Sequence, residues 1–420
     1  MKVKTRNITV EELSKLKKFK YKKPCKPSLL FKYLIRFLST GELKTTNFKY
    51  ELVNIDKIPN TPCLVLMNHS SFIDPKIASK ILKNKRYNIV SAKDSFINKN
   101  LLMRVIGCIP THKFINDVQV VKDIQYCLTK LKTDVLLYPE AGYTFDGTST
   151  VLPKSLGKLC KLLKVPVISI ITNGAFLRGP LYNNLQYRKV DVSAKVKLLF
   201  SVDDLKNLST DEINQKIKEE FSFDDLKYQL ENKVQIKDST RADSLNRILY
   251  KCPYCLTEGE MVGKGTELYC EHCKKTHILN EYGQLEGVGF EAKFSHIPDW
   301  YKWERDEVRK ELLNNEYNLE CEVDVYTIVD TKAFYKLGTG TLKHNNEGVF
   351  LNACDNKINY HLPPQLSYTL NCDFFFYEIA DTISFGDMKT LYYCFPKNKK
   401  DIVTKARLAS EELFKIKTNK

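Results

Sequence analysis

Short apolar runs alternate with longer amphipathic stretches between residues 60 and 200. The apolar runs are rich in β-branched and aromatic residues, which predicts buried strands at 63–67, 87–92, 135–138, 165–171 and 190–200. Between them, apolar positions recur at helical spacing, most clearly over residues 117–131 and 154–163. This alternation is typical of an α/β domain with a mostly parallel central sheet and flanking helices.

The rest of the chain changes character along its length. Residues 201–250 are polar with helical spacing, and residues 320–395 are rich in tyrosine, phenylalanine, valine and threonine, with Gly and Asn turns typical of antiparallel strands. Residues 400–416 predict a closing helix. We expect a small β-barrel capped by that helix; a small β-sandwich is an alternative. The expected parts are a membrane-associating segment (1–50), an α/β domain (51–205), a helical connection (206–250), a cysteine-bearing module (251–290) and a β-rich domain with a C-terminal helix (291–420).

Charge and cysteine content limit the partners and the compartment. The 420 residues carry a formal net charge of +16, which favours anionic partners such as lipid headgroups, nucleic acid or phosphorylated substrates. The 13 cysteines are an odd number, and residues 1–23 are polar and basic, so we expect no signal peptide and a reduced, cytosolic protein. No run reaches the roughly 18–20 apolar residues needed for a transmembrane helix.

Residues 28–38 form the most apolar stretch near the N-terminus. Lys32 and Arg36 interrupt it four positions apart, so they share one face of a helix. A short apolar helix with a basic stripe is typical of a segment that lies in the membrane interface. The alternative is an amphipathic helix packed on its own domain.

The strongest candidate for catalysis follows the first predicted strand. Residues 63–67 end in Asn68-His69, and Asp74-Pro75 predicts the start of a helix. The carboxyl ends of strands are where α/β folds bind ligands. A neutral imidazole there can take a proton from an attacking hydroxyl, while a carboxylate on its other nitrogen fixes the tautomer. The alternative is that Asp74 only caps the helix.

Three later segments accompany this pair in a fixed order. They are Gly-Cys-Ile-Pro-Thr-His-Lys at 107–113, Tyr-Pro-Glu-Ala-Gly at 138–142 and Val-Pro-Val-Ile-Ser-Ile at 165–170. With Asn-His-x4-Asp, they resemble the four signatures of the glycerolipid (1-acylglycerol-3-phosphate, or lysophospholipid) acyltransferase family. The resemblance implies that His69 is the general base and Asp74 its orienting partner. It also implies substrate-binding roles for Asn68, Lys113, Glu140, Gly142 and Arg178.

The sequence departs from the family at the acceptor phosphate. The third signature usually reads Phe-Pro-Glu-Gly-Thr-Arg, and its Arg is thought to hold that phosphate; here Ala141-Gly142-Tyr143 follows Glu140. In the second signature, Lys113 stands where Arg is more usual, and a lysine lacks the bidentate fork. Lys113, Lys154 and Arg178 are the candidates to supply the positive charge.

A second motif predicts a metal site. Cys252-Pro-Tyr-Cys255 is followed, after fourteen residues, by Cys270-Glu-His-Cys273. Paired Cys-x2-Cys knuckles at this distance match a tetrahedral four-thiolate zinc site, here in a zinc ribbon with a structural Zn²⁺. A redox dithiol pair and an iron–sulfur centre are the alternatives.

These features predict a peripheral enzyme on the cytoplasmic face of a membrane. It would transfer a fatty acyl group from acyl-CoA or acyl-carrier protein to a lysophospholipid, with 1-acyl-sn-glycerol-3-phosphate as the default acceptor. The alternative is a membrane-associated scaffold that keeps an inactive or altered acyltransferase fold and uses the zinc ribbon for interaction. Nucleic acid is not favoured as a partner, because no aromatic–basic recognition motif surrounds the cysteines.

Overall fold

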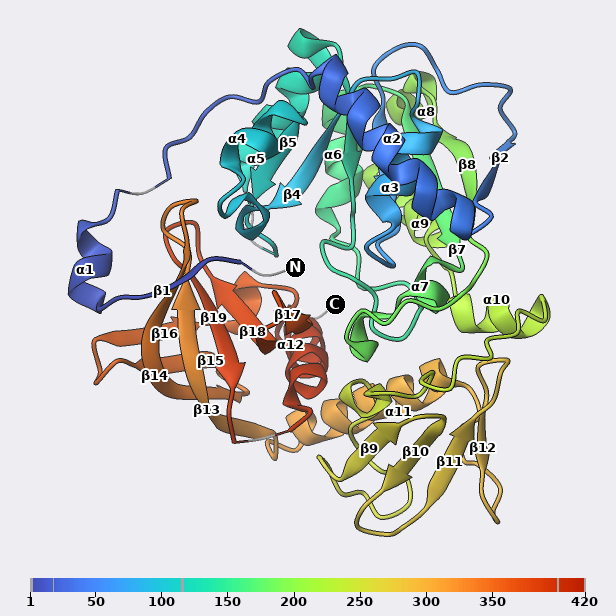
Figure 1. The fold of residues 1–420 in the computed structure, drawn as a ribbon. Coiled ribbons are helices and arrows are strands. Elements are labelled where there is room, and N and C mark those ends of the chain that lie inside the picture. The colour runs from blue at the N-terminus through green and yellow to red at the C-terminus, as the bar shows by residue number, and fades with distance from the viewer. Residues whose placement is uncertain (1–2, 18, 115–116, 399, 419–420) are drawn as a thin grey trace.

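The fold comes from a computed structural model that describes residues 3–17, 19–114, 117–398 and 400–418. Figure 1 shows three sheets along the chain: a parallel-rich sheet in the first half, a small sheet in the middle and a large antiparallel sheet towards the C-terminus. The predicted fold class is confirmed in each of these parts.

The first sheet has seven strands in the order β2-β8-β7-β3-β6-β4-β5. All neighbours are parallel except β7 and β8. Its strands are β2 (Lys49–Val53), β3 (Leu64–Met67), β4 (Tyr87–Ala92), β5 (Cys108–Thr111), β6 (Asp134–Leu137), β7 (Val167–Asn173) and β8 (Ser193–Phe200). The five predicted strands are all present. The edge strands β2 and β5 were missed, since neither has a continuous apolar run.

Helices cover both faces of this sheet, as alternation along the central strand requires. Leu64 and Leu66 of β3 pack on one side, and Val65 and Met67 pack on the other. One layer contains α2 (Leu29–Thr45) and α3 (Asp74–Ile81), and the other contains α5 (Val118–Tyr126), its π-helical continuation (Cys127–Leu131), α6 (Ser155–Leu163) and α9 (Thr210–Glu220). Shorter helices are α4 (Asn100–Val105), α7 (Ala175–Arg178), α8 (Val202–Asn207) and α10 (Asp225–Glu231).

The small sheet carries the cysteines. Its order is β12-β11-β10-β9, all antiparallel. The strands are β9 (Met261–Lys264), β10 (Glu267–Cys270), β11 (Thr276–Leu279) and β12 (Leu285–Gly287). The turn from β9 to β10 passes through Gly265 at φ +67°, and this hairpin connects the two cysteine pairs.

The large sheet follows one open path, β16-β15-β14-β13-β19-β18-β17, and β1 (Thr5–Asn7) adds to β14 in parallel. No pairing joins β16 to β17 in the described part of the chain, so the expected closed barrel is wrong. The strands are β13 (Asn318–Thr327), β14 (Phe334–Asn345), β15 (Gly348–Ala353), β16 (Ile358–Leu362), β17 (Asn371–Phe376), β18 (Ala380–Gly386) and β19 (Leu391–Pro396). The N-terminal strand thus belongs to a sheet built mainly from the last hundred residues.

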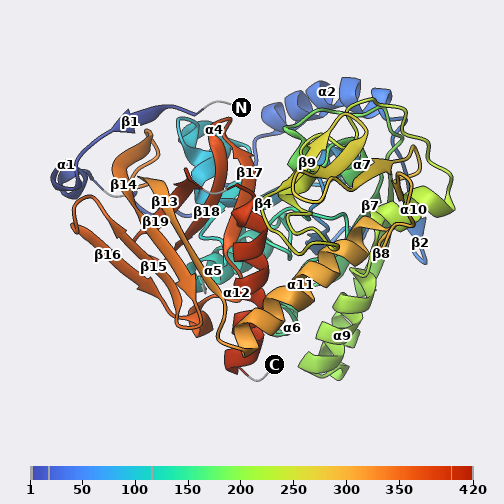
Figure 2. The same ribbon diagram turned by 90° about the horizontal axis from the view of Figure 1, so that it is seen from below.

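Two long helices connect the parts. The C-terminal helix α12 (Ile402–Thr418) was predicted, whereas α11 (Ile297–Leu313) lies where we expected part of the β-rich domain. Trp300, Val308 and Leu312 bury one face of α11 at helical spacing, which the sequence analysis overlooked. Figure 2 shows α12 between the large sheet and the rest of the molecule, with α11 crossing beside it.

Helix α2 extends to 17 residues, beyond the predicted 28–38. Ser39 and Leu43 are buried near its C-terminal end, where α2 packs on α3. Leu30 and Phe37 remain 74% and 76% exposed. The helix therefore packs on its own domain and also leaves an apolar surface. Among the described residues, no helix has the length and apolarity needed to cross a membrane.

Candidate active site and metal site

His69 and Asp74 meet at the carboxyl end of β3. The Nδ1 atom of His69 lies 3.0 Å from Oδ2 of Asp74, and the same oxygen accepts hydrogen bonds from the backbone N–H groups of Ser70 (2.8 Å) and Ser71 (3.0 Å). Asp74 is fully buried. Its carboxylate therefore stabilises the loop that carries His69. This differs from the alternative that Asp74 only caps the helix that begins there.

Two tyrosine rings enclose the imidazole of His69. The ring of Tyr138 lies 4.1 Å away and that of Tyr143 lies 3.8 Å away, with interplanar angles of 21° and 30°. Because both are nearly parallel to the imidazole at stacking distance, they must lie on opposite faces. The side chain of His69 is 16% exposed, and its Nε2 makes no hydrogen bond within the described residues. Burial lowers the pKa of His69, opposed by the hydrogen bond to Asp74, so the neutral base is favoured near pH 7.

Asn68 and Glu140 hold the loop rather than face open space. The carboxylate of Glu140 accepts hydrogen bonds from the backbone N–H of His69 (2.8 Å) and of Thr150 (2.9 Å). Burial raises the pKa of Glu140 to about 7, and those two hydrogen bonds act in the opposite direction. The amide of Asn68 bonds to Thr172 on β7 and to Ser70. Substrate contacts for Asn68 and Glu140 stay predictions.

The candidate cations lie in three different places. Lys113 has its Nζ 3.4 Å from Oδ1 of Asn371 on β17. Arg178 pairs with Glu42 at 3.0 Å, and the residue after it, Gly179, packs close to Ser71 in the His69 loop. Lys154 is exposed at the start of α6. The structure thus brings Lys113 and Arg178 towards the site and leaves Lys154 on the surface.

A cavity of about 20 Å³ lies beside Lys113, between the first sheet and the large sheet. Lys93, Thr111, Asn371 and Ser384 contribute to its lining. That volume holds about one water molecule. Gly142 lies beside Phe114, whose ring would be 3.4 Å from a Cβ at position 142.

The comparison with protein families decides what this part of the chain is. The family model described as Acyltransferase matches residues 49–173. Residues 49–173 are an acyltransferase domain. All four sequence signatures lie within the matched residues, so the predicted resemblance is confirmed for this segment.

A solved structure similar to the chain is the 1-acyl-sn-glycerophosphate (LPA) acyltransferase PlsC from Thermotoga maritima. The sequences are 17% identical and the TM-score is 0.37. The match covers 45% of this chain and 75% of that chain. No curated protein sequence matches the chain.

The large sheet and α12 contact the acyltransferase domain close to His69. The hydroxyl of Tyr377 donates to Asp94 at 3.1 Å, and Phe374 packs on Phe145 with ring centroids 4.5 Å apart. Nη1 of Arg407 on α12 donates a hydrogen bond to the carbonyl of Tyr143. The sequence analysis missed Tyr143 and Arg407 as site residues. For Tyr143, the signal in the sequence was its position, because it stands where the third signature has Arg.

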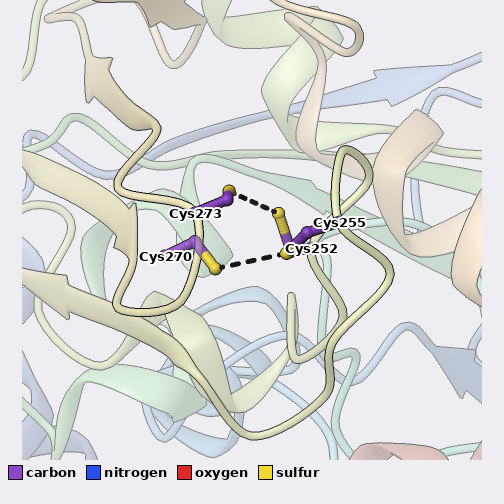
Figure 3. Close-up of side chains that lie close together, drawn as sticks. All are labelled: Cys252, Cys255, Cys270 and Cys273. Carbon is purple, nitrogen blue, oxygen red and sulfur yellow. Dashed lines mark hydrogen bonds between the residues drawn. The ribbon is translucent and has the colours of Figure 1, made fainter.

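The four predicted cysteines gather at one end of the small sheet (Figure 3). Their sulfur atoms all lie within 4.8 Å of one another, and the distances are 3.6 Å for Cys252–Cys273 and 3.7 Å for Cys255–Cys270. The S–S bond of a disulfide is about 2.05 Å long, so neither of these two pairs is a disulfide. A tetrahedral site with Zn–S bonds of 2.3 Å places its sulfurs about 3.8 Å apart, so the donor set and spacing fit a four-thiolate metal site.

Proposed function

We propose that the chain transfers a fatty acyl group from acyl-CoA or acyl-carrier protein to the hydroxyl of a lysophospholipid. His69 is the general base and Asp74 its orienting partner. One observation carries the proposal: within a matched acyltransferase domain, Nδ1 of His69 lies 3.0 Å from the buried carboxylate of Asp74, and Nε2 has no hydrogen-bond partner among the residues that the structure describes. A neutral imidazole needs both features to remove a proton: a free nitrogen to accept the proton, and a carboxylate on the other nitrogen to stabilise the imidazolium.

The reaction is a direct transfer with no acyl-enzyme. Nε2 of His69 removes the hydroxyl proton as the oxygen forms a bond to the thioester carbonyl carbon. The imidazolium that results is stabilised by Asp74. When the tetrahedral intermediate collapses, the C–S bond breaks and the thiolate leaves, taking its proton from the imidazolium. The ester and the free thiol are released, and His69 is neutral again.

The default acceptor is 1-acyl-sn-glycerol-3-phosphate, which gives phosphatidic acid. Lys113 and Arg178 are the cations proposed to bind its phosphate. Each already has a protein partner, Asn371 and Glu42, so an anionic headgroup must compete with those contacts. Because Tyr143 stands where the signature has Arg, the positive charge for the phosphate must come from Lys113 and Arg178.

Exposed apolar side chains on α2 support a membrane-bound position. Leu30 and Phe37 are the most exposed of them, and Lys32 and Arg36 lie on the same helix. An apolar helix surface with cations suits a bilayer of anionic lipid. We propose that α2 holds the enzyme on the cytoplasmic face of a membrane, where both acceptor and product reside.

We further propose that the metal bound by Cys252, Cys255, Cys270 and Cys273 is a structural Zn²⁺. The four thiolates would fill a tetrahedral site and leave no open position for chemistry. Metal binding would supply folding free energy to a module too small for a large core.

The experiment that tests the function is a transfer assay with purified full-length protein. Labelled acyl-CoA and acyl-carrier protein are offered with a panel of lysophospholipids, and His69→Ala is measured alongside. Transfer that disappears in the variant supports the proposal, and the preferred headgroup identifies the acceptor. If no acceptor gives His69-dependent transfer, the enzyme proposal is wrong and the scaffold alternative replaces it.

A further inference from the structure

One buried guanidinium links the C-terminal helix α12 to the segment beside the catalytic histidine. Arg407 is 5% exposed, and its Nη1 donates a 3.2 Å hydrogen bond to the backbone carbonyl of Tyr143, 264 positions earlier in the chain. Its Cζ lies 4.2 Å from the ring centroid of Phe145, a cation–π contact with the same segment. Arg407 therefore holds residues 143–145 at two points.

The segment that Arg407 holds is in direct contact with His69. The ring of Tyr143 covers one face of the imidazole at 3.8 Å, and the backbone N–H of Thr144 donates to the carbonyl of His69 at 3.1 Å. A movement of Tyr143 would therefore change both the packing of the imidazole and the backbone position of His69.

Arg407 itself is fixed by buried partners. Its Nε donates to Oε1 of Glu411 at 3.2 Å, and Glu411 also accepts from Arg305 on α11 and from Thr369. A buried guanidinium is stable only when its charge is paired and its donors are used. The network gives Arg407 one defined position against the acyltransferase domain.

The turn before Tyr143 requires such support. Ala141 has φ +55°, in the left-handed region that residues other than glycine rarely adopt. The third signature of the acyltransferase family that this chain resembles has Gly at the position of Ala141 and Arg at the position of Tyr143. A strained turn persists when surrounding contacts hold it. In this chain, Arg407 supplies one of those contacts from another part of the molecule.

We propose that Arg407 is a positioning residue for acyl transfer, which holds the ring of Tyr143 against His69 and thereby fixes the imidazole. The inference rests on the proposed function, because it gives Arg407 a part in the His69-dependent reaction. It makes the C-terminal helix a component of the active site.

The test compares three variants of the full-length protein in the transfer assay. We expect Arg407→Met to lower kcat about 10- to 100-fold with KM changed less than about threefold, since small displacements of a catalytic group have effects of this size. Arg407→Lys keeps the charge and should restore part of kcat. Arg309→Met is the matched control: it removes a hydrogen-bonded ion pair between α11 and Glu412 on α12 and leaves the partners of Arg407 in place, so it should at most lower the melting temperature while kcat stays within about threefold of wild type.

A double-mutant cycle tests the route through Tyr143. Tyr143→Leu removes the ring and keeps the backbone carbonyl. If Arg407 acts through that ring, the double variant should lose no more than about threefold beyond the weaker single variant, instead of the product of the two losses. If the two losses of kcat multiply in the double variant, or if Arg407→Met is fully active while the wild type is active, this inference is wrong and the proposed function still stands. A wild type without His69-dependent transfer would refute the proposed function, and this inference with it.

Discussion

Replacing Asp74 with asparagine tests the general-base proposal most directly, because the two side chains have the same shape. The asparagine oxygen can still accept from the N–H groups of Ser70 and Ser71. What is lost is the negative charge 3.0 Å from Nδ1 of His69. At an effective dielectric constant of about 20, a charge pair at that distance interacts by about 5 kcal/mol.

Part of that energy is retained, since an amide oxygen still accepts a hydrogen bond worth about 1 kcal/mol. The net loss of imidazolium stabilisation is then about 4 kcal/mol, which corresponds to a decrease of about 10³ in kcat. KM should change little, because Asp74 is fully buried and does not reach the substrate.

The assay is steady-state transfer of a labelled acyl group, with the melting temperature measured for each variant. Asp134→Asn is the matched control: Asp134 is also buried, accepts from the N–H of Cys63 and pairs with Lys85, but it lies at the opposite end of the strands. It should lower stability and leave kcat within about threefold. An Asp74→Asn enzyme with a kcat within tenfold of wild type would refute the assignment of Asp74 as the orienting carboxylate.

Three further predictions concern the metal, the membrane and pH. Replacing Cys252 and Cys273 with serine should release one equivalent of zinc in a metal analysis and lower the melting temperature, and wild type without bound zinc would contradict the site. Phe37→Glu should weaken retention on anionic liposomes at least about tenfold, since burying a phenylalanine contributes about 2 kcal/mol. Leu313→Glu, at an exposed position on α11, is the control and should have no effect on retention. Equal effects of the two substitutions would exclude α2 as the membrane contact. Because burial lowers the pKa of His69, the base stays neutral down to below pH 6.5, so kcat/KM should begin to fall only there; a fall centred well above that value would contradict His69 as the base.

Local patterns in the sequence predicted what local physics determines. The run at 63–67 is apolar and β-branched, and it forms β3 in the middle of the first sheet. His69 and Asp74 are five positions apart across a strand-to-helix turn, and that short distance along the chain brings them together. The same holds for the two cysteine pairs, which one hairpin connects. The division into domains stays a prediction.

Long-range contacts were beyond this kind of inference. Nothing near residues 5–7 indicates that they pair with β14, since register between distant strands depends on the whole sheet. The open path of the large sheet was missed for the same reason, because strand patterns do not specify whether the last strand returns to the first. Helix α11 was a different error: its buried positions have helical spacing that the sequence displays.

The contact between residues 143 and 407 changes how the acyltransferase domain should be regarded. The His69 loop and the third signature are each short segments of the sequence, but the guanidinium that holds Tyr143 comes from the C-terminal helix. Phe145 and Asp94 likewise have partners on β17 and beside it, Phe374 and Tyr377. An isolated fragment of residues 49–200 would expose these apolar and polar groups to water and would lose the contacts that support the strained turn at Ala141. We therefore expect the segment that the family model matches to lose acyl-transfer activity when it is separated from the C-terminal part, because its contacts with Arg407, Phe374 and Tyr377 would be lost.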